Sequence, residues 1–430
     1  MSSRFLFALW AGGGNVPPQI TLGKRLVQGG HRVKVLAPAV LRQRVEAAGL
    51  EFVPYRESPE HDEADAARGL SRDFEHRSPI AAAKAVRDRV FVGMAAPIAS
   101  DVLDILERQT VDVVVTDYIL TGALFAAETA KIPAAGLVHH IYPFPARGIP
   151  PFGNGWLPRP GVLGAARDAL GRAAFNRVWA KPLGEKLNQV RRRLGLRPLT
   201  GLDDLVRAYD RMLVLTSRSF DFPADLPPNV RYVGPHLEQP DETPAWDLPW
   251  SDHDSRPLVV ISLSTTYQAQ GDLLHRAIEA VGRLPVRALL TTGPVRVDAD
   301  SAPPNVRIVR FVPHARVLPH ARLVVTHAGH GTVMAALAHG LPLVCLPMGR
   351  DQGDNAARVV WHGTGVRLPA RSRPASIAEA IDHVLGDPAF AAAARRLAAA
   401  IAEEDAAGLG VDELRRLGAA PPLACAGERT

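Results

Sequence analysis

The sequence has few cysteines and no long apolar run. Its 430 residues include two cysteines, Cys345 and Cys425, which cannot build a disulfide framework. The first apolar run, residues 5–11, ends at Gly12-Gly13-Gly14 and is too short for the core of a signal peptide or for a membrane span. These features exclude a secreted disulfide scaffold and a membrane-spanning protein. They predict a cytoplasmic protein.

The sequence also lacks a large excess of positive or negative charge. The chain has 50 Lys and Arg residues and 44 Asp and Glu residues, a formal net charge of +6. This balance does not predict a nucleic-acid partner. The basic residues gather in residues 147–197 and end in Arg191-Arg192-Arg193, which predicts a solvent-exposed helix face. Peripheral contact with an anionic membrane is the less favoured interpretation.

Short apolar runs and helical patterns alternate along a chain that is too long for one ordinary core. The predicted strands are residues 4–10, 32–37, 111–116, 134–138, 258–263, 286–290, 306–309, 323–326 and 343–346. The predicted helices are residues 19–29, 97–109, 120–130, 271–282, 331–339, 353–362, 376–385 and 388–404. This rhythm predicts an α/β fold of two Rossmann-like, doubly wound domains that face a cleft.

The Pro- and Trp-containing stretch at 240–249 predicts the boundary between the two domains. We expect a first domain at 1–235, a linker at 236–250, a second domain at 251–417 and a frayed tail at 418–430. The last helices are expected to pack back on the first domain. The charged residues 57–77 predict a mobile loop, in which His61 is solvent-exposed surface and not a metal ligand.

A glycine-rich turn between a strand and a helix is the strongest local signal. Thr326-His327-Ala328-Gly329-His330-Gly331-Thr332 follows an apolar run and opens a helix. The glycines allow a ligand to approach the backbone, and the free N–H groups of the helix N-terminus suit a diphosphate. Taken alone, the motif fits an ordinary turn with a structural histidine equally well.

Other sequence motifs flank this glycine-rich turn on both sides. Residues 305–314 precede it, Gly340-Leu341-Pro342 and Pro347 follow it, and residues 351–356 read Asp-Gln-Gly-Asp-Asn-Ala. Together they resemble the signature of family 1 glycosyltransferases, which include macrolide and plant UDP-sugar enzymes. The resemblance implies the GT-B architecture, an acceptor-binding first domain and a second domain that binds a UDP- or TDP-sugar.

The resemblance also implies a role for each residue of the donor site. Phe311 would stack on the nucleobase, and the backbone of Val312 would read its edge. His327 would contact the α-phosphate, and the remaining phosphate contacts would come from Thr265, Gly329, Gly331 and Thr332. Asp351 and Gln352 would bind the sugar hydroxyls, which suits a carboxylate that accepts and an amide that both donates and accepts.

Three positions depart from the family pattern. Ala335 replaces a Glu that holds the ribose, and Ser264 replaces a Gly. Asn15 stands where the family has its catalytic His, and an amide cannot act as a general base. The preferred replacement is Asp117, acting directly or through a water molecule held by Asn15.

Two alternatives to Asp117 remain open. His139 or His140 could be the base, although these residues and Tyr142 fit a lining of the acceptor pocket equally well. An acidic acceptor would need little help from a base. Losing a general base costs roughly 10²–10⁴-fold in rate, which weakens an enzyme without abolishing its activity.

The sequence therefore predicts a hexosyltransferase that inverts the anomeric configuration and uses no metal or other cofactor. The acceptor is expected to be a small, hydrophobic, natural-product-like molecule. Two alternatives are a non-catalytic relative that binds nucleotide sugars and a sugar-nucleotide epimerase. A dinucleotide-binding fold is disfavoured, because Gly12-x-Gly14 is followed by Pro17 at the third glycine position.

Overall fold

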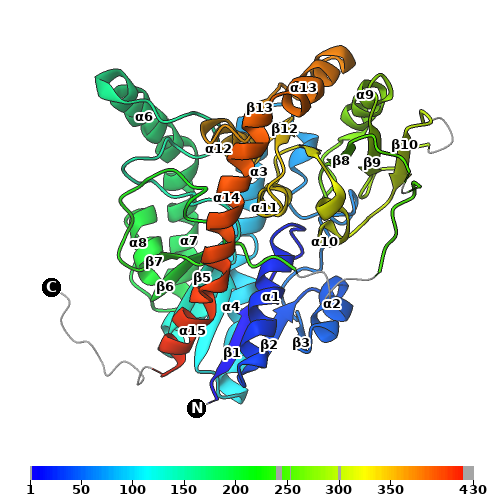
Figure 1. Cartoon of the computed structure of the whole chain (residues 1–430). Coiled ribbons are helices and arrows are strands. Elements are labelled where there is room, and N and C mark those ends of the chain that lie inside the picture. The colour runs from blue at the N-terminus through cyan, green and yellow to red at the C-terminus, as the bar shows by residue number, and fades with distance from the viewer. Residues whose placement is uncertain (1, 239–244, 252, 299–301, 420–430) are drawn as a thin grey trace.

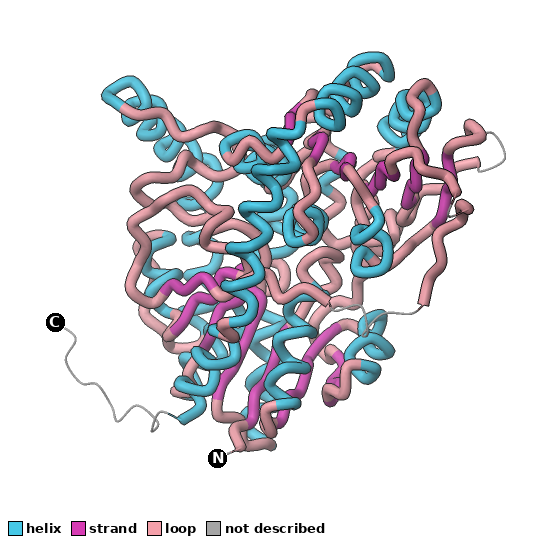
Figure 2. The backbone as a smooth tube through the Cα atoms, viewed as in Figure 1, coloured by secondary structure: helices cyan, strands magenta, loops and turns pink. Residues whose placement is uncertain are grey.

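Two parallel β-sheets form the frame of the protein. The computed structural model describes residues 2–238, 245–251, 253–298 and 302–419. Figure 1 shows the first sheet in the lower half of the view and the second above it, with the two groups of strands in magenta in Figure 2. The predicted pair of doubly wound α/β domains is confirmed.

The first sheet has seven strands in the order β3-β2-β1-β4-β5-β6-β7. Their bounds are β1 Arg4–Ala8, β2 Arg32–Ala37, β3 Glu51–Pro54, β4 Val113–Asp117, β5 Ala134–Val138, β6 Arg211–Val214 and β7 Val230–Tyr232. Its helices are α1 Val16–Gln28, α2 Arg42–Ala47, α3 Pro79–Val86, α4 Ala95–Arg108, α5 Thr121–Ala130, α6 Gly161–Phe175, α7 Lys181–Arg193 and α8 Leu202–Ala208. Apolar side chains of α4, α5 and α7 cover one face, and those of α1 cover the other.

The second sheet has six strands in the order β10-β9-β8-β11-β12-β13. Their bounds are β8 Leu258–Ser262, β9 Arg287–Thr291, β10 Val306–Val309, β11 Leu323–Thr326, β12 Leu343–Cys345 and β13 Gly365–Arg367. The helices are α9 Gly271–Gly282, α10 His314–Val317, α11 His330–Ala338, α12 Gln352–Trp361, α13 Pro374–Gly386, α14 Pro388–Ala406 and α15 Leu409–Ala419. Helices α11, α12 and α14 cover one face, and α9 and α13 cover the other.

In both sheets the chain reverses its winding direction between two central strands. The order changes between β1 and β4 in the first sheet and between β8 and β11 in the second. The loops that leave these strands at their carboxyl ends diverge, and the gap between them is where open α/β sheets bind ligands. The chain therefore has two such positions, one on each sheet.

Helices α14 and α15 return from the second sheet to the first. Figure 1 shows α14 running down the molecule toward α15, which lies beside β1. Arg25 of α1 forms an ion pair with Asp405 of α14, and Leu414 of α15 is buried in the core of the first sheet. The tail predicted from residue 418 begins inside α15, and residues 420–430 lie outside the described part of the chain.

Several predicted elements differ from the structure at their ends. Helix α1 starts at Val16 and not at residue 19, because Pro17 and Pro18 occupy its first turn, where a missing N–H costs nothing. The short strands β3, β6, β7 and β13 were not predicted. Among the basic residues predicted to be solvent-exposed, Arg191 is buried and forms an ion pair with Glu128.

Within the described ranges, no helix combines the length and the apolar character that a membrane crossing needs.

A buried ion pair joins the two halves of the molecule behind the cleft. Arg358 of α12 lies 2.6 Å from Asp221, which follows β6. Asp221 also accepts hydrogen bonds from the hydroxyl of Tyr232 at 2.7 Å and the backbone N–H of Tyr142 at 3.1 Å. Burial raises the pKa of Asp221, but the charge of Arg358 and these donors outweigh it, and the net pKa is lowered.

Replacing Arg358→Met should destabilise the protein strongly. The change leaves the carboxylate of Asp221 buried without its cation, which costs about 3–5 kcal/mol in unfolding free energy. Denaturant unfolding followed by circular dichroism measures the loss. The matched control is Arg256→Met, which breaks the more exposed Arg256–Asp254 pair and should change stability little. Equal losses in the two variants would contradict this account.

Candidate functional site

A cavity of about 2310 Å³ lies between the carboxyl ends of the two sheets. Loops from both sheets line it. The residues that the sequence predicted for the donor all lie on its wall: Thr265, Phe311, Val312, His327, Gly329, Gly331, Thr332, Asp351 and Gln352. Asn15, His139 and His140 line it from the first sheet. The fold therefore brings the two predicted groups of residues together.

The glycine-rich turn leads from β11 into α11. Gly329 is the N-cap residue of this helix, and no side chain caps the N-terminus. A Cβ at Gly329 would lie 2.5 Å from Nε2 of His327, so a side chain there would displace the His327 ring from its position. Gly331 is exposed, with no atom within 4 Å of an added Cβ. The first N–H groups of α11 are therefore open to an anion.

His327 and Thr332 complete the wall of this turn. Both side chains are largely buried and line the cavity. Burial lowers the pKa of His327 to about 4, so the ring is neutral at pH 7 and offers one N–H. Such an arrangement suits a phosphate oxygen, which the helix N-terminus also attracts.

Phe311 stands at the outer edge of the cavity. Its side chain is 69% exposed, which is unusual for a residue of this size, whereas the neighbouring Val312 is buried. An exposed ring that is fixed at a cavity wall offers a flat apolar face to a planar ligand. Thr265, at the carboxyl end of β8, lies exposed on the same cavity wall.

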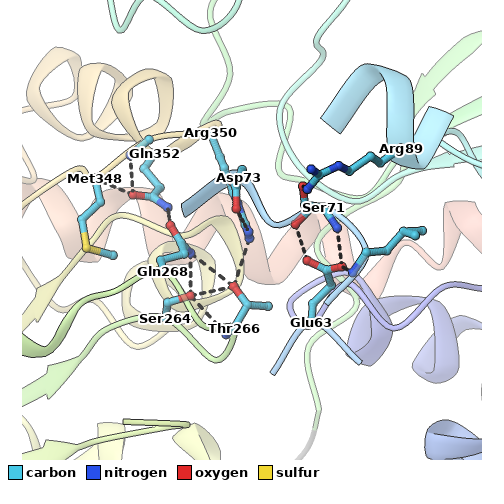
Figure 3. Close-up of polar contacts among 12 residues, drawn as sticks. Glu63, Ser71, Asp73, Arg89, Ser264, Thr266, Gln268, Met348, Arg350 and Gln352 are labelled. Atoms are coloured by element: carbon cyan, nitrogen blue, oxygen red, sulfur yellow. Dashed lines mark hydrogen bonds and ion pairs between the residues drawn. The ribbon is translucent and has the colours of Figure 1, made fainter. Parts of the chain in front are cut away.

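The loop before α12 carries a network of polar side chains, shown in Figure 3. Oε1 of Gln352 accepts hydrogen bonds from the backbone N–H groups of Met348 at 2.7 Å and Gly349 at 3.1 Å. Its Nε2 donates to Gln268 at 2.8 Å, and Gln268 donates to Ser264 at 2.6 Å. Gln352, which was predicted to bind a sugar, therefore already holds the loop together.

Arg350 connects this loop to the first half of the chain. The residue has a positive φ of 55° and its guanidinium donates to both carboxylate oxygens of Asp73, at 2.7 and 2.8 Å. It also donates to the hydroxyl of Thr266 at 3.0 Å, as Figure 3 shows. Burial raises the pKa of Asp73, but its bonds to Arg350 outweigh it and the net pKa is lowered. Neither the conformation nor the pairing of Arg350 was foreseen from the sequence.

The segment that carries Asp73 buries several of its polar side chains, although many of its residues are exposed. The prediction of a solvent-exposed His61 is wrong, because its Nε2 accepts a hydrogen bond from the backbone N–H of Ala11 and its side chain is buried. Glu63 is also buried and accepts hydrogen bonds from the backbone N–H and the hydroxyl of Ser71. The sequence does not reveal that nearby backbone N–H groups donate hydrogen bonds to charged side chains such as Glu63.

The glycine loop after β1 contacts this same part of the second half. Gly13 has a φ of +86°, and a Cβ added there would lie 2.6 Å from the methyl group of Thr266. The backbone N–H of Tyr267 donates to the carbonyl of Glu63 at 3.0 Å. Gly13 and residues 57–77 thus close one side of the cavity.

Asp117 lies beneath the cavity at the end of β4. Its side chain is 0% exposed and it does not line the cavity. Its Oδ2 accepts hydrogen bonds from Nδ2 of Asn15 at 3.0 Å and Nε2 of Gln19 at 2.6 Å. Its Oδ1 accepts from the backbone N–H of Ile119 at 3.1 Å. Asp117 is therefore shielded from the cavity, which disfavours direct transfer of the acceptor proton to it; its predicted role as the base, directly or through a water molecule held by Asn15, stays a prediction.

His139 lies between Asp117 and the cavity. Its Nδ1 is 3.0 Å from Oδ2 of Asp117, and its side chain is 15% exposed. Burial raises the pKa of Asp117, but the charge of His139 and the surrounding donors outweigh this effect and the net pKa is lowered. Nδ1 lies close to the carboxylate without the alignment of a hydrogen bond, and Nε2 is the ring nitrogen farther from it.

His140 has a different environment. Its Nδ1 lies 2.7 Å from the carbonyl of Ile141, and its Nε2 lies 2.8 Å from the hydroxyl of Tyr118. Burial lowers the pKa of His140 to about 4. In the neutral ring Nδ1–H donates to the carbonyl and Nε2 accepts from the hydroxyl, so the lone pair is already used. The prediction that Tyr142 lines the acceptor pocket is wrong, because its side chain is buried in the core.

Aromatic side chains form a wall of the cavity on the side of the first sheet. The rings of Phe91 and Trp179 meet edge to face at 5.1 Å, and Phe175 stacks on Trp179 at 5.3 Å. Phe91 and Trp179 lie on π-helical turns at Arg87–Val92 and Asn176–Ala180, and such turns are frequent at functional sites. The spacing of these aromatic residues along the sequence did not reveal the wall.

Known proteins that are similar to this chain agree with a two-domain fold that has a cavity between its sheets. The family described as "Erythromycin biosynthesis protein CIII-like, C-terminal domain" matches residues 275–408. The chain is 34% identical, over 97% of its length and 100% of the relative, to 4'-demethylrebeccamycin synthase of Lentzea aerocolonigenes. In fold it is similar to the calicheamicin glycosyltransferase CalG4, with a TM-score of 0.75, 23% identity and coverage of 98% of this chain and 100% of the other. It is also similar to the glycosyltransferase VinC in complex with dTDP, with a TM-score of 0.65, 20% identity and coverage of 96% and 99%.

Breaking the Asp73–Arg350 pair should loosen one side of the cavity without unfolding either sheet. Asp73→Asn leaves the partly buried guanidinium of Arg350 without its counter-charge, which should weaken the contact between the two segments. Hydrogen exchange measured by mass spectrometry should become faster in residues 57–77 and 348–352. Glu75→Gln, which breaks the more exposed pair with Arg72, is the matched control and should change exchange little. Unchanged exchange in the Asp73→Asn protein would contradict the bridging role.

Proposed function

The chain belongs to the family 1 glycosyltransferases, and on this premise we propose that it transfers a sugar from a UDP- or TDP-sugar to a small apolar acceptor with inversion at the anomeric carbon. The observation that carries this proposal is the position of His139. It lies on the wall of the cavity that the donor residues also line, and Asp117 is directly behind it. Family membership disfavours the alternatives of a sugar-nucleotide epimerase and a non-catalytic relative.

We assign the base to His139 and the orienting role to Asp117. Nε2 of His139 takes the proton of the acceptor as the acceptor's lone pair forms a bond to the anomeric carbon. The bond from that carbon to the diphosphate oxygen breaks on the opposite face, which inverts the configuration. Asp117 stabilises the imidazolium that results. Asn15 keeps Asp117 in place by donating to it but takes no proton.

The departing diphosphate carries the negative charge of the reaction. The open N–H groups at the start of α11 and the side chains of His327 and Thr332 stabilise this charge on the other side of the cavity. We therefore expect that transfer requires no metal cofactor. The aromatic wall around Phe91 and Trp179 supports an apolar acceptor, which it would hold largely through buried area.

Product analysis tests the proposed reaction. The purified protein is incubated with TDP-glucose or UDP-glucose and a panel of aromatic and macrolactone acceptors, and the products are identified by mass spectrometry. Because both donors are α-linked, the anomeric proton coupling in the product should be that of a β-glycoside. An α-glycoside would contradict inversion. Loss of donor with no acceptor, giving an isomeric sugar nucleotide, would support an epimerase.

Removal of the base tests the assignment of His139. His139→Ala should lower kcat by about 10²–10⁴-fold, because general base catalysis contributes this much. The affinity for TDP, measured by calorimetry, should not change, since the residue lies on the acceptor side. Added imidazole should restore part of the rate. Full turnover in this variant would show that the acceptor is acidic enough to need no base or that another group takes the proton.

A further inference from the structure

Residues 152–156 form a bend between β5 and α6 that lies beside the proposed base. All five residues line the cavity. The ring centroids of Phe152 and His140 are 5.4 Å apart and the two rings are stacked. The ring of His140 in turn lies 4.8 Å from the ring of His139. The 152–156 bend is therefore part of the wall that an acceptor would meet next to His139.

The second half of the chain holds this bend through a buried carboxylate. Asp354, in the first turn of α12, accepts hydrogen bonds from the backbone N–H of Gly153 at 2.6 Å and of Gly155 at 2.9 Å, one on each oxygen. Nη1 of Arg367 in β13 donates to the carbonyl of Gly155 at 2.7 Å. The two backbones also approach closely, because a Cβ added to Gly155 would lie 2.9 Å from the carbonyl oxygen of Gly353. These contacts fix the bend against the start of α12.

The start of α12 also carries residues assigned to the donor. The helix begins at Gln352, directly after Asp351, and both residues line the cavity. Asp354 follows within the same turn, but its side chain is buried and it does not line the cavity. Asp354 therefore acts on the cavity only through the bend, and it joins the loop on the donor side to the wall on the acceptor side.

Asp354 is kept ionised at a cost to stability. Burial raises the pKa of Asp354 to about 6, an effect that the charge of Arg358 and the two backbone N–H groups only partly offset. Above pH 7 the carboxylate is therefore ionised, and both its oxygens accept hydrogen bonds. A carboxyl group whose pKa is higher in the folded than in the unfolded chain makes folding less favourable as the pH rises through that pKa, and the cost persists at higher pH. A buried charge that costs stability is typical of functional sites.

We propose that Asp354 is a positioning residue, which holds the 152–156 bend in the shape that binds the acceptor beside His139. The inference rests on the proposed function, since it concerns the acceptor side of the same cavity. Without the carboxylate, the N–H groups of Gly153 and Gly155 lose their acceptor, and the bend gains freedom that acceptor binding must then remove. The acceptor is then bound more weakly, whereas the start of α11, where the diphosphate would bind, does not change.

A purely structural link between the two halves of the chain is the main alternative. The halves are already joined by the Arg358–Asp221 and Arg350–Asp73 pairs, so the contacts of Asp354 are not needed for this purpose. The two roles also predict different results. Loss of a structural link lowers the free energy of unfolding, whereas loss of a positioning residue weakens acceptor binding at unchanged affinity for the donor nucleotide.

Binding and hydrogen exchange measurements on Asp354→Ala separate these roles. Alizarin, a polycyclic phenol, serves as the acceptor probe, and its binding is followed by quenching of tryptophan fluorescence, since Trp156 and Trp179 line the cavity. The variant should bind alizarin about tenfold to a hundredfold more weakly than the wild-type protein, because two hydrogen bonds to a charged group are lost. Exchange measured by mass spectrometry should become faster at residues 150–157. The affinity for TDP, measured by calorimetry, should not change.

Two further variants keep the test decisive. Asp354→Asn retains one carbonyl oxygen and should give intermediate values, and it carries the test if the alanine variant does not fold. Asp387→Ala removes a carboxylate that accepts a backbone N–H outside the cavity, from Ala389, and should behave like the wild-type protein.

Unchanged exchange at residues 150–157 in the Asp354 variants would overturn the inference, as would faster exchange with unchanged binding of alizarin. A wild-type protein that does not bind alizarin would instead contradict the apolar acceptor of the proposed function. One that does not bind TDP would contradict its donor.

Discussion

The carboxylate of Asp117 imposes the strongest constraint on the site. An ionised group with no access to water is stable only when hydrogen-bond donors replace its hydration. Asn15, Gln19 and the backbone of Ile119 donate hydrogen bonds to it, and Nδ1 of His139 lies 3.0 Å from Oδ2. This requirement fixes the start of α1, the loop after β1 and the end of β5 relative to β4. Among these residues, His139 is the titratable one that also lines the cavity. The buried charge of Asp117 therefore affects the cavity through the ring of His139.

The two halves of the cavity have opposite electrostatic character. The start of α11 offers uncapped N–H groups to an anion, whereas the Asp117–His139 pair offers a site for a proton. Both positions lie where the strand order of a sheet reverses, which explains why neither needs an added domain or insertion. The Arg350–Asp73 pair holds the two sides together, next to the loop that carries Asp351. The fold therefore places the group that would take the proton on one side of the cavity and the N–H groups that would hold the departing diphosphate on the other.

The sequence predicted the fold well, because strands and turns depend on local patterns, and the residues that the resemblance assigned to the donor all line the cavity. Strands such as β5 and β11 are apolar runs bounded by turns, and the glycine turn lies directly between a strand and a helix. The sequence named both Asp117 and His139 as candidate bases but did not show that Asp117 is buried and His139 lines the cavity, because burial depends on how α1 and β5 pack around β4. His61 was misjudged because its ring accepts a hydrogen bond from the backbone N–H of Ala11, 50 positions earlier in the sequence. The pairing of Arg350 with Asp73 spans 277 positions and leaves no local signal.

In the proposed mechanism His139, and not Asn15 or Asp117, faces the nucleophile. A crystal structure with TDP and an acceptor bound would show which of these residues does so. We expect the nucleophilic atom within hydrogen-bond distance of Nε2 of His139, with the diphosphate against the N–H groups of Gly331 and Thr332. An acceptor whose nucleophilic atom lies beyond reach of His139, or a diphosphate bound away from the start of α11, would contradict it.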